Sequence, residues 1–278
     1  MSDATLPADP PDTGAEVLVR THDGLRLAGT LLVPPGHHDG SRDAALFLHG
    51  SGADREQGGL FTRVARGLAD GGVATLRFDL PGHGHSEGRQ AELSLSGLLN
   101  LIGSGLRELR ERTGAARIAV LAAGLTGGVA AGYAARRGDE IGRLVLFDPL
   151  IDYQEHFTAD SPRWRGGRLT EPAGRTLLAD GALASACGLA AGRAMLNEVF
   201  WLQPRGVLGA VTAPTLIVHG TGAARVPVAS SRSAAGALTA EHRLVELPPG
   251  GDPLAGAVSA ALAWLLPGTS HAGDDASG

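Results

Sequence analysis

The chain has 278 residues, is 43% hydrophobic and carries a formal net charge of −5, which suits one large α/β domain and excludes a disordered chain. It has no run of basic residues and no apolar stretch of membrane-spanning length, so neither nucleic acid nor a membrane is an expected partner. The acidic, proline-rich start is unlike a signal peptide and Cys187 is the single cysteine, so an internal disulfide is excluded and a cytoplasmic location is expected.

Taken in chain order, the predicted elements begin with a hairpin over residues 16–34, in which Asp23-Gly24 supplies the turn. Short apolar runs then alternate with segments that have apolar residues at helical spacing. Strands are expected at 44–50, at the start of 73–88, and at 117–123, 143–149, 213–220 and 242–251, and helices at 59–72, 95–114 and after residue 123. This alternation predicts the α/β class, with a mostly parallel sheet and helices on both faces.

One segment breaks the alternation, because residues 153–205 have no strand period and their second half looks helical. We expect this segment to be a helical cap inserted between two core strands. Ligands of such sheets bind beyond the carboxyl ends of the strands, so the cap would line the pocket. Cys187 lies in this segment and is predicted to be a small buried side chain. The expected division of the chain is two tails, a two-part core and the cap, at 1–14, 15–152, 153–205, 206–267 and 268–278.

Four signatures make the chain similar to the α/β-hydrolase superfamily. They are "LFLHGSG", "LRFDLPGHGHSEG", "VLAAGLTGGVAA" and "PTLIVHGTGAARVP", and the resemblance covers residues 16 to 266. The chain most resembles serine aminopeptidases, monoacylglycerol-lipase-like enzymes and the acyl-transferase thioesterase of bacterial luminescence. The resemblance implies an α/β-hydrolase fold with a helical cap. It says less about activity, because function resides in the site and not in the fold.

The same resemblance implies an oxyanion hole made of two backbone amides. One amide belongs to the loop after "LFLHG", which is Ser51 here, and the other belongs to the residue after the nucleophile, Leu125. Three further residues are expected around the pocket, with His49 as a support of the Gly50 loop and His83 as a structural histidine of the second signature. Backbone amides keep their function whatever the side chains are, so the hole does not depend on a complete catalytic triad.

The nucleophile position implied by the resemblance carries no serine. Counting six residues from Ile118 places the nucleophile at Gly124. A shift of one residue places it at Leu125. A further shift places it at Thr126, which forms "GLTGG" and is the only one of the three to offer a hydroxyl. Gly124 is the preferred alignment, and Thr126 is then a packing residue or makes a local hydrogen bond.

The acid and the base of the implied triad are also replaced. The acid position falls on Ala223, whose methyl group cannot orient a histidine, and the base position falls on Asp252, which also fits a turn before proline. Asp148, at the end of "RLVLFD", is an alternative acid that can equally be a turn residue. His156, at the start of the cap, is a further candidate acid or base.

Acyl transfer by a Ser-His-Asp triad needs all three groups, so the sequence predicts that this is not an ordinary serine hydrolase. The favoured hypothesis is an elimination (lyase) or cyclisation reaction on an acylated small molecule of secondary metabolism, in which the oxyanion-hole amides assist a carboxylate or histidine. The alternatives are an esterase or thioesterase with Thr126 as displaced nucleophile, and a small-molecule-binding protein without activity. No metal-ligand spacing and no nucleotide-binding loop occurs, so no cofactor is expected. The expected partner is a small-molecule substrate, with a homodimer left open.

Overall fold

The central element of the fold is an eight-stranded sheet. The computed structural model describes residues 14–35, 37, 43–159, 161–222 and 226–266. The order of the strands in the sheet is β1-β2-β4-β3-β5-β6-β11-β12. Their bounds are Ala15–Arg20 (β1), Arg26–Leu32 (β2), Asp43–Leu48 (β3), Ala74–Phe78 (β4), Arg117–Ala123 (β5), Arg143–Phe147 (β6), Thr215–Gly220 (β11) and His242–Leu247 (β12).

Six of the eight strands, β4, β3, β5, β6, β11 and β12, run parallel to one another, and the other two form the N-terminal hairpin. The hairpin of β1 and β2 pairs antiparallel and then joins β4, also antiparallel. Gly24 lies in its turn with φ 92°, a conformation that favours glycine. The hairpin predicted from Asp23-Gly24 is therefore confirmed.

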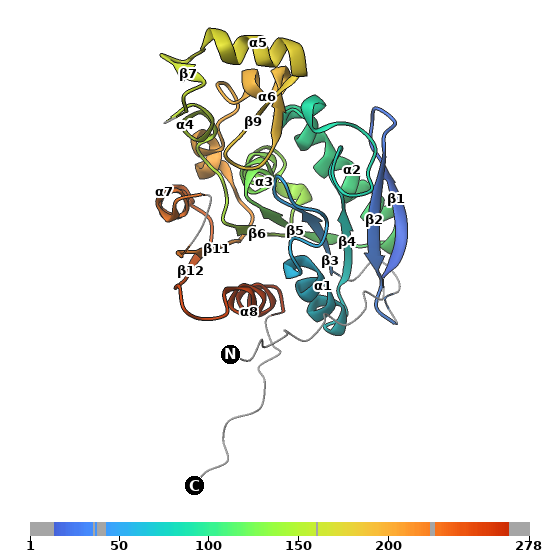
Figure 1. Ribbon diagram of the computed structural model, residues 1–278. Coiled ribbons are helices and arrows are strands. Elements are labelled where there is room, and N and C mark those ends of the chain that lie inside the picture. The colour runs from blue at the N-terminus through green and yellow to red at the C-terminus, as the bar shows by residue number, and fades with distance from the viewer. Residues whose placement is uncertain (1–13, 36, 38–42, 160, 223–225, 267–278) are drawn as a thin grey trace, which may run out of the picture.

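Helices cover both faces of this sheet (Figure 1). Along β3 successive side chains are buried in two different clusters, because neighbouring residues of a strand point to opposite faces. One cluster includes the buried sides of α1 (Leu60–Asp70) and α8 (Pro253–Leu265). The other includes α2 (Leu95–Thr113), α3 (Leu125–Arg136) and α7 (Val228–Ala237). The predicted fold class, a mostly parallel sheet with helices on both faces, is confirmed.

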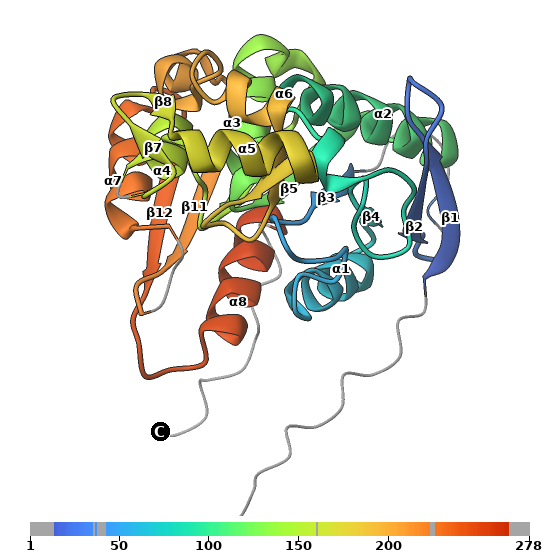
Figure 2. The same ribbon diagram turned by 45° about the horizontal axis from the view of Figure 1, so that its top comes forward.

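The chain between β6 and β11 forms a mixed segment of short helices and two small hairpins, which lies above α3 in Figure 1 and in front of it in Figure 2. The expectation that it is helical is only partly right, because Cys187 lies in the turn of a hairpin and not in a helix. The elements are α4 (Tyr153–Thr158), β7 (Trp164–Arg165), β8 (Arg168–Leu169), α5 (Glu171–Asp180), β9 (Ala182–Ala184), β10 (Ala190–Gly192), α6 (Arg193–Glu198) and the 3-10 turn η3 (Pro204–Ala210).

Polar contacts tie this segment to the sheet domain. The carboxylate of Glu198 accepts hydrogen bonds from the backbone N–H and the hydroxyl of Ser96, in the first turn of α2. The Gln90 side chain accepts a bond from Ala190 N–H at 3.2 Å. On the other side, Arg205 of η3 donates to the hydroxyl of Ser233 in α7 at 2.8 Å. The segment is thus anchored at both of its sides.

Residues 1–13 and 267–278, which contain almost all of the two predicted tails, lie outside the described residues, as does Ala223. Within the part of the chain that the structure describes, no helix is both long and apolar enough to cross a membrane.

Candidate functional site

The turn between β5 and α3 is the centre of the candidate site. Gly124 is the residue at this turn, with φ 56° and ψ −121°, and α3 begins at the next residue. Its N–H donates to the Phe147 carbonyl of β6 at 2.9 Å, and its carbonyl accepts from the Leu150 N–H at 2.9 Å. Of the three predicted alignments, the structure places Gly124, and neither Leu125 nor Thr126, at the sharp turn. A Cβ added to Gly124 would meet only the Cα of Gly50, at 3.9 Å, so the space above the turn is open.

Thr126 lies inside α3 and makes structural hydrogen bonds. Its side chain is buried, and its hydroxyl lies 2.8 Å from the Leu48 carbonyl, 3.1 Å from the His49 carbonyl and 2.9 Å from the Ala123 carbonyl. One hydroxyl proton shared among three carbonyls ties the end of β3 to the end of β5. Thr126 is not in the lining of the cavity described below, so the geometry does not support it as a displaced nucleophile.

In the described part of the chain, two backbone amides without a partner belong to residues that line the cavity beside Gly124. Among the described residues, the N–H groups of Ser51 and Leu125 have no hydrogen-bond partner, and both residues line the same cavity. The Leu125 N–H is at the first position of a helix, where backbone amides have no partner within the helix. The two residues therefore stay the candidate donors of the oxyanion hole that the sequence predicts.

His49 supports the loop that carries Ser51. It is fully buried, and its Nε2 accepts a hydrogen bond from Leu80 N–H at 2.9 Å while its Nδ1 donates to the Gly50 carbonyl at 2.8 Å. Both ring nitrogens are therefore occupied, and burial lowers the pKa of His49 to about 4, so the ring is neutral. The ring of His83 packs against it with centroids 5.1 Å apart. Neither ring lies in the cavity lining, so both are structural supports.

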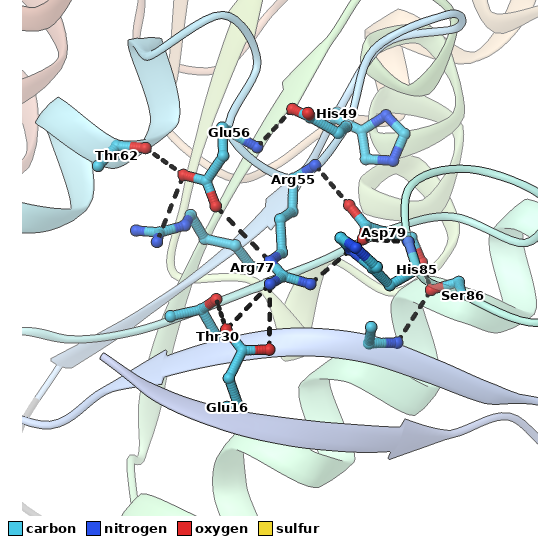
Figure 3. Close-up of polar contacts among 12 residues, drawn as sticks. Glu16, Thr30, His49, Arg55, Glu56, Thr62, Arg77, Asp79, His85 and Ser86 are labelled. Atoms are coloured by element: carbon cyan, nitrogen blue, oxygen red, sulfur yellow. Dashed lines mark hydrogen bonds and ion pairs between the residues drawn. The ribbon is translucent and has the colours of Figure 1, made fainter. Parts of the chain in front are cut away.

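An ionic network, buried at Arg77 and Asp79 and exposed at Glu16, holds the remainder of the loop after β3 (Figure 3). Arg77 of β4 is 1% exposed, and its guanidinium lies 3.5 Å from the carboxylate of Glu56. Arg55 bridges Asp79 at 3.2 Å and Glu16 of β1 at 2.9 Å. A buried arginine requires a partner, since an unpaired charge in the interior is strongly destabilising. The network therefore fixes the loop to β1 and to β4 with the residue that follows it.

Asp148 is the carboxylate next to the turn. It follows Phe147 at the end of β6, and Phe147 pairs in register with Ala123, the residue before Gly124. Parallel strands lie about 4.8 Å apart, so Asp148 and Gly124 are neighbours. The Asp148 side chain is 48% exposed, and its Oδ1 accepts from Gly220 N–H at 2.9 Å. Its backbone has φ 43°, an unusual value for a residue with a side chain.

These groups line one cavity of about 380 Å³, which also receives a residue from the segment above it. Cys187, between β9 and β10, contributes a side chain that is buried as predicted, with its Sγ 3.1 Å from Ser185 Oγ. The sequence did not indicate that it faces the site. The lining residues are Gly50, Ser51, Gly52, Ala53, Gln57, Leu60, Ala123, Gly124, Leu125, Phe147, Asp148, Leu150, Cys187 and Val226.

Two predicted acid–base candidates lie outside this cavity. Asp252 is exposed at the start of α8, where its Oδ1 accepts from Ala255 N–H at 3.0 Å, and it caps the helix. His156 of α4 lines a different cavity with Glu155 and Arg205, and burial lowers the pKa of His156. The expectation that either residue acts in the pocket is therefore corrected, and Asp148 is the candidate that the fold brings to the turn. No group of three or more potential metal ligands occurs in the described part of the chain.

Comparison with known proteins supports an α/β-hydrolase fold. The family model described as "Serine aminopeptidase, S33" matches residues 40–177. Ferulic acid-bound Est1E from Butyrivibrio proteoclasticus matches with a TM-score of 0.76 and 19% identity, over 90% of this chain and 98% of that one. A monoacylglycerol lipase from Paleococcus ferrophilus matches with a TM-score of 0.64 and 19% identity, over 86% and 98%.

A dienelactone hydrolase from Anabaena variabilis is similar with a TM-score of 0.60 and 21% identity, covering 91% of this chain and 95% of that one. A search of curated protein sequences finds no significant relative. The family model includes the loop after β3, the turn at Gly124 and the end of β6. Sheet order, turn and family model agree, and the chain belongs to the α/β-hydrolase superfamily.

Proposed function

We propose that this protein is an enzyme that binds the carbonyl group of an acylated small molecule and moves a proton without forming an acyl-enzyme. The observation that carries the proposal is the turn itself. Gly124 has the positive-φ backbone of a nucleophile turn and two unpartnered amides beside it, but it has no side chain to attack a carbonyl. The carboxylate adjacent to it is Asp148, which accepts one backbone hydrogen bond, lies 3.6 Å from His219 Nδ1 and is half exposed.

The reaction favoured by this arrangement is elimination of an acyloxy group from a β-acyloxy carbonyl compound. Asp148 takes the proton between the carbonyl and the acyloxy-bearing carbon, and the C–H electrons form an enolate whose oxygen accepts hydrogen bonds from Ser51 and Leu125. The enolate then re-forms the carbonyl, a carbon–carbon double bond forms, and the carboxylate leaves with the bonding electrons. Asp148 returns its proton to the departing carboxylate or to water. A cyclisation in which the enolate attacks within the same molecule uses the same first step.

The rate effects expected from these groups suit a substrate with an acidic C–H bond and a good leaving group. Each oxyanion-hole donor lowers a barrier by about 3 kcal/mol, and a positioned general base adds roughly 100-fold or more in rate. Together these effects suffice for an acidic C–H bond with a good leaving group. They fall short of what an amide bond requires, which is why a proton transfer is favoured over peptide hydrolysis.

Hydrolysis by direct attack of water is the second candidate. The space above Gly124, where only Gly50 Cα would lie within 4 Å of an added Cβ, leaves room for a water molecule in the place of a serine hydroxyl. Asp148 would take a proton from this water as it attacks the carbonyl. The likeness to esterase and lipase structures supports an ester or thioester as the substrate.

The experiment that tests the proposal is a mass-spectrometric product screen in H₂¹⁸O. The panel contains β-acyloxy ketones, simple esters and thioesters, and the enzymes are the wild type, Asp148→Asn and the control Asp252→Asn. Elimination gives an alkene and a carboxylic acid without ¹⁸O, because both oxygens come from the substrate. Hydrolysis gives an acid with one ¹⁸O atom.

We expect alkene or ring products in the wild type, a loss of about 100-fold in Asp148→Asn and less than a twofold change in Asp252→Asn. Asparagine caps a helix as well as aspartate does, so the control variant retains its fold. Acid labelled with ¹⁸O would favour the hydrolase. Tight binding of a panel member without any product would favour a binding protein and contradict the proposed enzyme.

A further inference from the structure

A second polar side chain faces the cavity beside Gly124, and it belongs to Gln57. Among the described residues, Gln57 and Asp148 are the two non-glycine residues with positive φ, at 49° and 43°, and both line the cavity. Such a conformation costs about 1–3 kcal/mol for an ordinary residue. A glycine at position 57, like the two glycines that follow it, would adopt a positive φ at little cost. The presence of a glutamine at this strained position therefore points to a function for its side chain.

The orientation of the Gln57 amide is fixed by the backbone. The Gly50 N–H donates to Gln57 Oε1 at 2.8 Å, and an N–H can only donate, so the oxygen of the amide must face Gly50. Gln57 Nε2 consequently carries its two N–H groups on the other side. Within the part of the chain that the structure describes, these N–H groups have no acceptor.

Gln57 Nε2 lies next to the turn. A Cβ added to Gly50 would lie 3.3 Å from the Ala123 carbonyl oxygen and 3.6 Å from Gln57 Nε2. The space on this side of Gly50 is therefore bounded by the peptide before Gly124 and by the side-chain amide. The free donor of Gln57 is thus placed at the edge of the open space in which the reacting carbonyl is proposed to bind.

The number of lone pairs decides what this donor binds. A carbonyl oxygen accepts two hydrogen bonds, and the amides of Ser51 and Leu125 supply two donors. When the carbonyl is bound with both lone pairs occupied, a third donor is available for a different oxygen of the substrate. We infer that Gln57 binds a second acceptor oxygen of the substrate, on the atoms next to the reacting carbonyl, as in a β-oxygenated carbonyl compound. This inference rests on the proposed binding of a carbonyl group in the cavity.

The test compares two neutral ketones that differ by one atom. In 4-methoxybutan-2-one an ether oxygen replaces one CH₂ group of 2-hexanone, so both have the same length and the same carbonyl. Their Kd values are measured by ligand-observed NMR with the wild type, Gln57→Glu, Gln57→Met and the control Gln154→Glu. A glutamate at position 57 still accepts from Gly50 N–H but cannot donate, and a methionine removes the donor without adding charge.

We expect the preference for the ether over 2-hexanone to fall about fivefold in Gln57→Glu and Gln57→Met, with the Kd of 2-hexanone changed less than twofold. Gln154 lies on the exposed surface of α4 and its variant should retain the wild-type preference. An unchanged preference in both Gln57 variants, with both ketones bound, would overturn the role of Gln57 alone. Failure of the wild type to bind either ketone would overturn the carbonyl site itself and this inference with it.

Discussion

At the scale of single residues, Gly124 itself makes its hydrogen bonds to backbone groups alone. Its N–H and its carbonyl bond to Phe147 and Leu150, and the carbonyl also accepts from Gly127 N–H at 3.1 Å. The geometry therefore does not depend on a side chain at position 124. This explains how a hydroxyl can be absent while the turn and the adjacent amide of Leu125 keep their places.

Thr126 provides a prediction at this scale. Thr126→Val removes the hydroxyl that the carbonyls of Leu48, His49 and Ala123 share, and should lower the free energy of unfolding by about 1–3 kcal/mol. Thr126→Ser keeps the hydroxyl and should lose only about 1 kcal/mol, through the missing methyl group. Urea unfolding measures both effects. If Thr126→Val abolished turnover while leaving the free energy of unfolding unchanged, the hydroxyl would have a chemical role that we do not assign to it.

At the scale of elements, the packing of α3 depends on a glycine in its first turns. A Cβ on Gly128 would lie 2.1 Å from the Leu150 carbonyl oxygen and 2.6 Å from the Tyr153 hydroxyl. The Tyr153 hydroxyl itself donates to the Leu125 carbonyl at 2.9 Å, and burial raises the pKa of Tyr153, so this donor stays protonated. The start of the segment above the site can lie against α3 only because position 128 has no side chain.

Two glycines of α3 form a matched pair for a prediction. Gly128→Ala should lower the free energy of unfolding by about 3 kcal/mol, because backbone and a buried side chain would have to move. Gly132→Ala should raise it by about 0.5–1 kcal/mol, because an added Cβ meets nothing within 4 Å and alanine favours helix. Thermal or urea unfolding of both variants checks the pair. A loss of stability of similar size in Gly132→Ala would show that the helix, and not its contact with residues 150–153, responds to the methyl group.

At the scale of the whole molecule, the buried histidines make stability depend on pH. The pKa of His49 is lowered from 6.5 to about 4 by burial, and burial also lowers the pKa of His83. Between pH 6.5 and about pH 4, His49 binds a proton in the unfolded chain but not in the folded protein. Stability is therefore fully present above about pH 6.5 and is lost as the pH falls.

We predict that the free energy of unfolding falls by about 2 kcal/mol from pH 7.5 to pH 5 through His49. His49→Gln should be less stable at pH 7.5 but should lose most of this pH dependence, with a remainder from His83. Urea unfolding at both pH values measures the difference. An equally steep loss in His49→Gln would assign the effect to other groups.

The prediction that the segment between β6 and β11 is helical was partly wrong for a physical reason. The sequence of residues 183–204 reads as helical because alanine and leucine favour helices, yet residues 182–192 form a hairpin of two three-residue strands. Strands this short carry too few residues to show a period of two. Tertiary contacts decide here, since a Cβ on Gly192 would lie within 2 Å of the Ala91 carbonyl oxygen and a Cβ on Gly52 would lie 3.1 Å from the Gly188 carbonyl oxygen.

The sequence by itself determined the fold class and the hairpin at Asp23-Gly24, because hydrophobic periodicity and turn residues act over short distances. Only the tertiary structure chose among the candidate acids and bases. Asp148 reaches the site because β6 pairs with β5 in register, whereas Asp252 follows the edge strand β12 and caps α8. Gln57 gave no signal in the sequence, since its role depends on a positive φ and on the approach of the Gly50 N–H.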